Sequence, residues 1–173
     1  MAKRQLALPN LLLLSDARND ARLERAIARL PRGSGLVYRH YHLAPAARRA
    51  RYAALRRLCR RRGILVITAR GARGWPADGA YGAPRTLGHA GLRLATAHSL
   101  REIGAAARAR ADAVLLSPVF ATRTHPGGKV LGAVRFLCLA RCSPLPVYAL
   151  GGMTAKRAAR LPVHGWAAID GLC

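Results

Sequence analysis

The sequence contains no apolar run that approaches the roughly 18 residues needed to cross a bilayer. Near the N-terminus, charged residues precede Leu11–Leu14, which is too short for the hydrophobic part of a signal peptide. There are only four cysteines, and no second Cys or His pair lies at the spacing of a zinc site, so we expect reduced structural thiols. These absences predict a cytoplasmic protein with no membrane partner.

Aromatic and acidic residues are also scarce. Aromatic residues make up 5% of the chain, and seven Asp and Glu stand against thirty Lys and Arg, so the formal net charge is +23. Such a charge favours nucleic-acid binding. However, the sequence has no aromatic-rich RNA-binding strand, no zinc-finger spacing and no clear helix-turn-helix pattern, and most arginines fall in helical segments. We therefore expect weak, non-specific binding at low salt and no specific nucleic-acid partner.

The chain has enough apolar sequence for one core. Its residues are 51% hydrophobic, which is typical of a globular protein. At 173 residues, the chain is too short for two well-filled cores. We expect a single domain over residues 1–173.

Short apolar runs alternate with helical patterns along the whole chain. The strand candidates are Leu11–Leu14, Leu36–Tyr41, Ile64–Thr68, Gly79–Tyr81, Leu92–Ala95, Ala113–Leu116, Val147–Leu150 and Trp166–Ile169. Strands that alternate with helices favour a parallel sheet, and eight of them favour a closed (β/α)8 barrel.

The predicted helices have recognisable ends. Pro45 opens one whose apolar face we expect to include Ala47, Ala50, Ala54 and Leu58, and Gly63 is placed to end it. Ser99 is a candidate N-cap for the helix that contains Leu100 and Ile103. Further helices are predicted near 23–30, 133–141 and 154–161.

The barrel is expected to be reduced, because a typical one has about 250 residues. The segment 70–78 is rich in Gly, Arg and Pro, and residues 84–91 leave room for only one or two turns. Missing outer helices would expose apolar strand surface, so we predict a homo-oligomer that covers part of it.

The richest loop lies between the sixth strand and the helix after it. Ser117 to Gly132 reads SPVFATRTHPGGKVLG, with hydroxyls at Thr122 and Thr124 and basic groups at Arg123 and Lys129. Backbone N–H groups, hydroxyls and positive charge together suit an anion, which predicts a phosphate-handling loop.

This order of motifs resembles the thiamine phosphate synthase and thiazole tautomerase family of barrels. The family's loop after strand six reads Gly-Pro-Val-Phe-x-Thr-x-Thr-Lys-Pro-Gly with Leu-Gly a few residues later. The matching residues here are Pro118, Val119, Phe120, Thr122, Thr124, Pro126, Gly127, Leu131 and Gly132. The segments Pro146–Met153, Ala77–Gly79, Thr96–Ser99, Ser15–Arg18 and Tyr38–Arg39 also resemble family segments.

The resemblance implies a transferase of thiamine biosynthesis. An aminopyrimidine diphosphate would lose pyrophosphate and join a thiazole phosphate, with Mg²⁺ and basic groups stabilising the leaving group. The phosphorylated substrates would contact a set of anion-binding residues, namely Arg39, Thr122, Thr124, Gly151 and Gly152. His98 and His125 would be the acid, base or charge candidates.

The departures from the family lie in the metal and pyrophosphate positions. In strand two, the family's Gln and Lys around the Arg become Val37 and Tyr41 here, so that only Arg39 remains. After strand three, the family has Asn-Asp, whereas this chain has Thr68-Ala69. After strand four, the family has Gly-Gln-Glu-Asp, whereas residues 83–86 of this chain are Ala-Pro-Arg-Thr. Both carboxylates that would bind Mg²⁺ are therefore absent. We therefore assign no metal ligand. Arg70 and Arg85 stand near these positions and could supply charge in place of the metal.

Each candidate also has a purely structural interpretation. Arg39 could be an ion-pair partner of Asp16 at the barrel rim, His98 a hydrogen-bonded rim residue, and Gly151-Gly152 a tight turn. His40 and His42 alternate with Arg39, so we expect them to face the helices in structural roles. The rival functions are a divergent barrel that binds a phosphorylated ligand or acts like the tautomerase, and a basic binding or regulatory module.

Overall fold

The computed structural model is a closed barrel of eight parallel strands in sequential order. It describes residues 7–69, 72, 74–88, 91–122 and 127–172. The elements in chain order are β1 (Leu11–Leu14), η1 (Asp20–Arg22), α1 (Leu23–Arg29), β2 (Gly35–Tyr38), α2 (Pro45–Arg62), β3 (Leu65–Thr68), β4 (Gly79–Gly82), η2 (Pro84–Thr86), β5 (Leu92–Ala97), α3 (Leu100–Arg108), β6 (Ala113–Leu116), α4 (Gly132–Arg141), β7 (Val147–Leu150), α5 (Ala155–Ala158) and β8 (Gly165–Ala168). The predicted reduced (β/α)8 barrel is confirmed.

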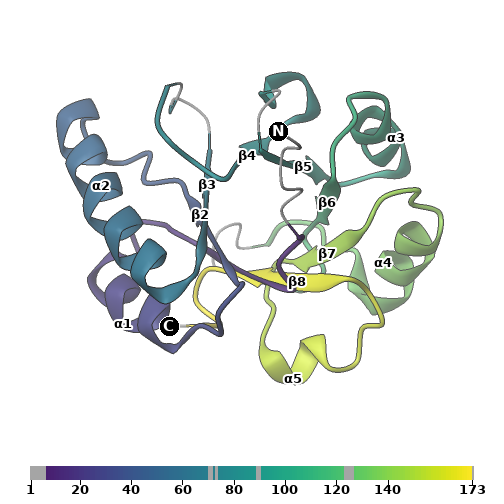
Figure 1. The fold of residues 1–173 in the computed structure, drawn as a ribbon. Helices are drawn as coiled ribbons and strands as arrows, with labels where there is room; N and C mark the ends of the chain where they lie inside the picture. The colour runs from purple at the N-terminus through teal and green to yellow at the C-terminus, as the bar shows by residue number, and fades with distance from the viewer. Residues whose placement is uncertain (1–6, 70–71, 73, 89–90, 123–126, 173) are drawn as a thin grey trace.

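The outer layer of helices is incomplete. Figure 1 shows α1 and α2 at the left of the barrel, α3 and α4 at the right, and α5 below β8. The described residues between β3 and β4 form no helix, and β4 is followed only by the short η2. No helix within the described residues has both the length and the apolar character of a membrane span.

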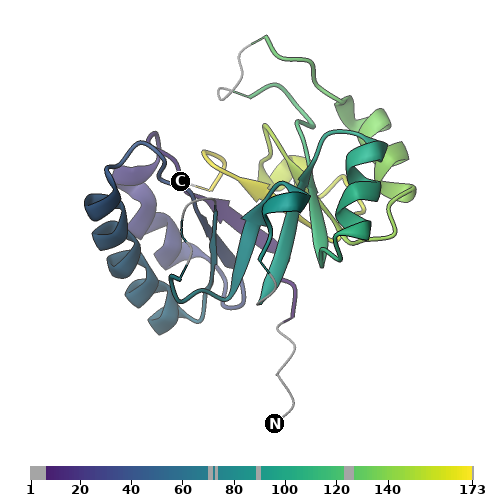
Figure 2. The ribbon, with the colours of Figure 1, turned by 90° about the horizontal axis from the view of Figure 1, so that it is seen from above.

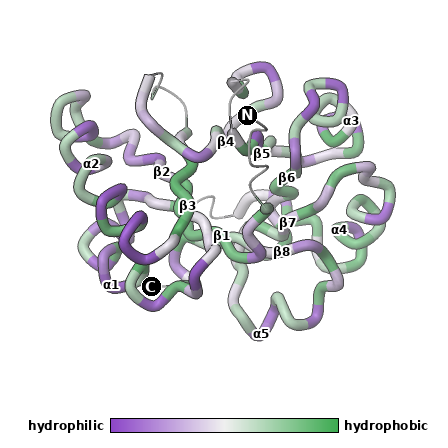
Figure 3. The backbone as a smooth tube through the Cα atoms, viewed as in Figure 1, coloured by the Kyte–Doolittle hydropathy of each residue, from purple (hydrophilic) through white to green (hydrophobic). Residues whose placement is uncertain are grey.

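Alternation along the strands builds two layers of core. Leu12, Leu14 and Val37 belong to a cluster that also contains Ile67, Leu94, Leu115 and Tyr148, and all of these are fully buried. The neighbouring residues Leu13, Leu36 and Tyr38 belong to a second cluster with residues of α1 and α2. Because successive strand residues point to opposite faces, the first cluster fills the barrel and the second seals the helices onto it. Figure 3 shows hydrophobic residues along the strands and a mixture of hydrophilic and hydrophobic residues along the helices around them.

The long helix α2 has the predicted ends but not the predicted buried face. Pro45 lies in its first turn, and Gly63 ends it in the left-handed conformation with φ 67°. Its buried residues are Arg48, Tyr52, Leu55 and Cys59, whereas Ala47, Ala50 and Ala54 are exposed and Leu58 is half-buried. The expectation for this face was wrong, because the aromatic side chains Tyr38 and Trp75 pack on Tyr52 and select the neighbouring stripe of the helix.

The cysteines divide between core and surface. Cys59 is free and buried, whereas Cys138 in α4 and Cys142 at the C-cap of α4 are free and exposed. Burial raises the pKa of the Cys59 thiol to about 12. A structural packing role therefore fits Cys59, whereas Cys138 and Cys142 are exposed to solvent, and Cys173 lies outside the described residues.

Candidate functional site

All eight strands are parallel, so their carboxyl ends open at one end of the barrel. This is the end where barrels of this architecture place their active sites. Arg39 follows β2, His98 follows β5, the loop from Ser117 follows β6, and Gly151 follows β7. The fold therefore brings Arg39, His98, Thr122, Gly151 and Gly152 to a common rim, while Thr124 and His125 lie outside the described residues.

The loop after β6 is fastened to its neighbours by backbone hydrogen bonds. Its Val119 and Phe120 N–H groups donate to the Leu150 and Gly151 carbonyls, at 2.9 and 3.1 Å. At its other end, Leu131 and Gly132 donate back to the Pro118 and Val119 carbonyls, at 2.9 and 3.0 Å. Figure 2 shows the described parts of the loop, 117–122 and 127–131, extending from the barrel beside α4.

The two glycines after β7 permit this close packing. Gly151 has φ 99°, and a Cβ atom there would lie 2.8 Å from Cα of Pro118. Gly152 has φ 61°, and a Cβ atom there would lie 2.5 Å from the Ala121 carbonyl oxygen. Both positions therefore need glycine for conformation and for space. Contact with an anion stays a prediction for both.

His98 is held in one orientation at the end of β5. Its Nδ1 lies 2.7 Å from the Ser117 carbonyl oxygen, and its backbone N–H donates to a Glu102 carboxylate oxygen at 2.7 Å. A carbonyl can only accept, so Nδ1 carries the proton in that bond and a neutral ring leaves Nε2 as an acceptor. The ring is exposed, so this acceptor is available to a ligand. The adjacent Ser99 caps α3 by accepting from Glu102 N–H, as the sequence predicted.

Arg39 forms the expected ion pair at the end of β2. Its guanidinium lies 3.8 Å from Oδ2 of Asp16 and 5.7 Å from the centre of the Tyr41 ring. Its backbone N–H donates to Ser15 Oγ at 2.8 Å. Tyr41 is 46% exposed and lies beside the guanidinium groups of both Arg39 and Arg48.

A buried chain of polar side chains supports the loop that carries Arg39. His40 is fully buried, with Nδ1 2.7 Å from Ser15 Oγ and Nε2 2.8 Å from Asp20 Oδ1. Burial outweighs the influence of Asp20 and holds the pKa of His40 below its usual value. Arg51 in turn donates to Asp20 Oδ1 at 2.8 Å and to both carboxylate oxygens of Glu24. Sequence reasoning missed this network.

A positive φ of 35° at His40 ends the extended backbone of β2 three residues before the predicted end at Tyr41. The predicted alternation of side chains therefore stops at Tyr38, and it does not determine which way His40 and His42 face. His40 is buried beside Tyr38, with ring centres 4.7 Å apart, whereas His42 is exposed. The acidic residues Asp20 and Glu24, four apart and followed by Arg51 on the next helix, are the sequence signal for part of the network.

Arg18 neutralises the carboxylates at the end of β1 and β8. Its Nε donates to Asp16 Oδ1 at 2.9 Å, and its Nη1 lies 3.5 Å from Asp170 Oδ2. Burial raises the pKa of Asp16, but the hydrogen bonds and charges of Arg18 and Arg39 outweigh it and leave the pKa below its usual value. The negative charges of Asp16 and Asp170 are therefore balanced by arginine and repel an approaching phosphate less strongly.

The residues present do not fit the Mg²⁺ that the family implies. Thr68 and Ala69 follow β3, and residues 83–86 after β4 contain no carboxylate. All seven Asp and Glu of the chain lie in the described residues, and each accepts from a cation or a backbone N–H. No carboxylate is therefore left at the two expected positions to hold the ion.

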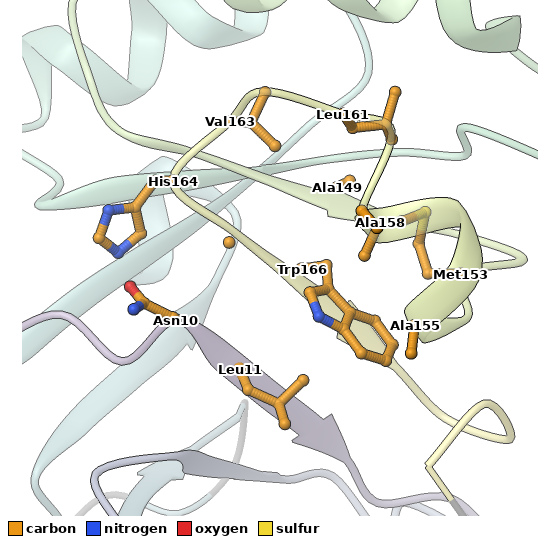
Figure 4. Close-up of a pocket in the computed structure, with 12 residues that line it drawn as sticks. Asn10, Leu11, Ala149, Met153, Ala155, Ala158, Leu161, Val163, His164 and Trp166 are labelled. Carbon is orange, nitrogen blue, oxygen red and sulfur yellow. The ribbon is translucent and has the colours of Figure 1, made fainter. Parts of the chain in front are cut away.

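One hollow in the described part of the chain lies outside the barrel, away from the rim. It has a volume of about 420 Å³, and its lining includes Leu11 of β1, Ala155 of α5 and Trp166 of β8. Figure 4 shows Trp166 beside Ala155 and Met153, with Asn10 and His164 at the polar end. The helix α5, Ala155–Ala158, is shorter than the predicted helix over 154–161 and leaves this apolar surface open. Self-association over it stays a prediction.

Comparisons with known proteins agree with this architecture. The family described as thiamine monophosphate synthase matches residues 11–172. A curated Aquifex aeolicus protein, provisionally named thiamine-phosphate synthase 2, is 37% identical over 62 residues, which are 36% of this chain and 33% of the relative.

Two solved structures resemble the fold. A thiamine phosphate pyrophosphorylase from Pyrococcus furiosus has a TM-score of 0.76 at 22% identity, over 93% of this chain and 85% of that one. A structure titled native KDPGal has a TM-score of 0.56 at 14% identity, over 94% and 83% of the two chains. At identities this low, the similarity supports the fold assignment alone.

Proposed function

Because the chain belongs to the thiamine monophosphate synthase family, we propose that it is a transferase of thiamine biosynthesis. The proposed reaction joins an aminopyrimidine diphosphate to a thiazole phosphate. The bond between the pyrimidine methylene carbon and the pyrophosphate oxygen breaks, and its electron pair leaves with pyrophosphate. The thiazole nitrogen then supplies the pair for the new carbon–nitrogen bond.

The observation that carries this proposal is the rim itself. The loop after β6 packs on the Gly151-Gly152 turn, and Arg39 and His98 occupy the same end of the barrel. Thr122, Arg39 and the loop's backbone would position the phosphates, and His98 Nε2 would accept a hydrogen bond from substrate. Thr124 and His125 belong to this proposal from the sequence alone.

Arginine would supply the positive charge that Mg²⁺ supplies in the family pattern, where two carboxylates hold the ion. Arg85 is exposed on η2, directly after β4, where the family pattern has a metal-binding carboxylate. Guanidinium groups pair with phosphate oxygens in a two-point geometry and stay charged at any working pH. Arg70, which lies outside the described residues, is the second candidate for this role.

A coupling assay with both thiamine precursors, run with Mg²⁺ and with a chelator, tests the proposal. We expect product in both conditions, and a loss of at least about tenfold in kcat/KM for Arg39→Ala or Thr122→Ala. Arg135→Ala, on the exposed surface of α4, is the matched control and should leave the rate unchanged. Turnover that needs Mg²⁺ would contradict the arginine role, and absence of product would contradict the reaction.

The lost metal carboxylates also favour one alternative, a divergent barrel that binds a phosphorylated ligand without the synthase reaction. Pro118 occupies the position where the tautomerase branch is expected to have a histidine, so that branch's catalytic assignment does not transfer. Retained binding of a phosphorylated thiazole, without product in the coupling assay, would favour this alternative.

A further inference from the structure

A group of potential metal ligands lies beside β2, apart from the positions after β3 and β4 where the family holds Mg²⁺. Asp20 lies in η1, and His40 and His42 lie between β2 and α2. One ligand atom from each residue lies within 4.8 Å of the other two. Within the described residues, this is the group of three such side chains that comes together closely enough to hold one ion.

The ring of His40 is held in a fixed position beside Asp20 and His42. Its ring stacks on Tyr38 at an interplanar angle of 11° and is fully buried. Ser15 Oγ lies 2.7 Å from Nδ1, and Asp20 Oδ1 lies 2.8 Å from Nε2. A carboxylate can only accept, so in this structure Nε2–H donates to Asp20 and Nδ1 accepts from the Ser15 hydroxyl. An ion at Nε2 would move the ring proton to Nδ1, which would then donate to Ser15 Oγ. A hydrogen bond at the second ring nitrogen is the usual device that fixes a metal-binding histidine.

The other two residues leave the group open to solvent. His42 is exposed, and its ring centre lies 5.1 Å from that of His40. The Asp20 side chain keeps 29% of its exposure, so its carboxylate can move. Nε2 of His40 and Oδ1 of Asp20 are 2.8 Å apart, and an ion bound tetrahedrally by both needs a separation of roughly 3.3 Å. A shift of about half an ångström would therefore admit the ion.

Arg51 is the competitor for Asp20. Its Nη2 lies 2.7 Å from Asp20 Oδ1 and donates to the Asp20 carbonyl oxygen at 3.0 Å. The same guanidinium also donates to both carboxylate oxygens of Glu24. These further contacts can keep the guanidinium in place when the Asp20 carboxylate turns to a cation. Its charge and the chain's net charge of +23 will weaken the binding of a dication.

We propose that Asp20, His40 and His42 form a site for a transition-metal dication such as Zn²⁺, Co²⁺ or Ni²⁺. Two imidazole nitrogens and one carboxylate oxygen suit these ions, whereas Mg²⁺ prefers oxygen ligands alone. Three protein ligands leave at least one coordination position open to water or an anion. The site is independent of the proposed transferase reaction.

Titration of the chelator-treated, tag-free protein with Co²⁺ and with Zn²⁺ tests the site without substrates. We expect one equivalent to bind, with a Co²⁺ visible spectrum typical of low coordination number. His42→Ala should weaken binding by about tenfold or more, and because His42 is exposed this variant should fold normally. His164→Ala, an exposed histidine at the opposite end of the barrel, is the matched control and should bind as the parent does.

Two further variants separate a ligand role from a folding role. Arg51→Met removes the competing cation and should tighten Zn²⁺ binding, an effect that damage to the fold would not produce. Asp20→Asn should weaken it. The proposal is overturned if the parent protein binds no Zn²⁺ or Co²⁺ at millimolar concentration, or if His42→Ala and the parent bind equally.

Discussion

Two parts of the barrel rim are built by different means. The rim at β1 and β2 is held by side chains, through the contacts of Ser15, Asp16, Asp20, His40 and Arg51. The rim at β6 and β7 is held by backbone hydrogen bonds and by glycines that allow two loops to touch. Residues 113–169 contain no Asp or Glu at all.

The difference explains where the family pattern survives. A backbone-built rim depends on a few glycines and on chain direction, so its motif can be read from the sequence as a run of fixed residues. A rim built from charged side chains can exchange partners, and here Val37 and Tyr41 stand where the resemblance leads us to expect Gln and Lys. Predictions for the two rims therefore differ in kind.

The largest effect is expected from adding one methyl group to the backbone-built rim. In Gly152→Ala, the new Cβ would lie 2.5 Å from the Ala121 carbonyl oxygen, at φ 61°. Strain and overpacking together should lower the free energy of unfolding by about 2–5 kcal/mol. Chemical denaturation monitored by circular dichroism measures this change.

Gly132→Ala is the control for backbone conformation alone. Gly132 has φ 70°, and nothing lies within 4 Å of a Cβ atom there. Gly132→Ala is expected to lower the free energy of unfolding by about 1–2 kcal/mol. Equal losses in the two variants would show that packing between the loops contributes nothing.

A second comparison removes one hydroxyl from each rim. Ser15 is fully buried, and its Oγ bonds both the Arg39 N–H and His40, so Ser15→Ala leaves polar groups without partners and should cost about 1–3 kcal/mol. Ser117 Oγ has a contact of only 3.4 Å with His98, so Ser117→Ala should cost under about 0.5 kcal/mol. Thermal and denaturant unfolding of the two variants should rank them in this order. The reverse order would contradict the assignment of side-chain support to β1 and β2.

Sequence reasoning succeeded where local signals agree. The bounds of β1, β6 and β7 match their apolar runs, and Gly63 ends α2 as expected. It failed for the buried face of α2. Arg48 is buried there among Tyr38, Tyr41 and Trp75, and only the tertiary structure brings those rings together.

The candidate site divides in the same way. The position of Arg39 beside Asp16 follows from strand order, because neighbouring parallel strands end side by side. The Ser15–His40–Asp20 chain depends on a left-handed backbone at a histidine, which few residues other than glycine adopt. No local pattern predicts that conformation, so the Ser15–His40 part of the network could not be found from the sequence.

The smallest expected effect concerns acid stability, and it falls on the charged rim. The pKa of Asp16 is lowered in the fold, because Arg18 and Arg39 outweigh the effect of burial. The ion pairs therefore stabilise the protein at pH values above the unfolded pKa of 3.8, and this contribution is lost as the pH falls through the lower folded value. Asp16→Asn should cost under about 1 kcal/mol at pH 6, as is usual for a partly exposed ion pair. The difference in melting temperature between Asp16→Asn and the parent should narrow below pH 3.8, and at pH 6 it should shrink in high salt. A difference that stays constant across pH and salt would mean that Asp16 acts through hydrogen-bond geometry and not through charge.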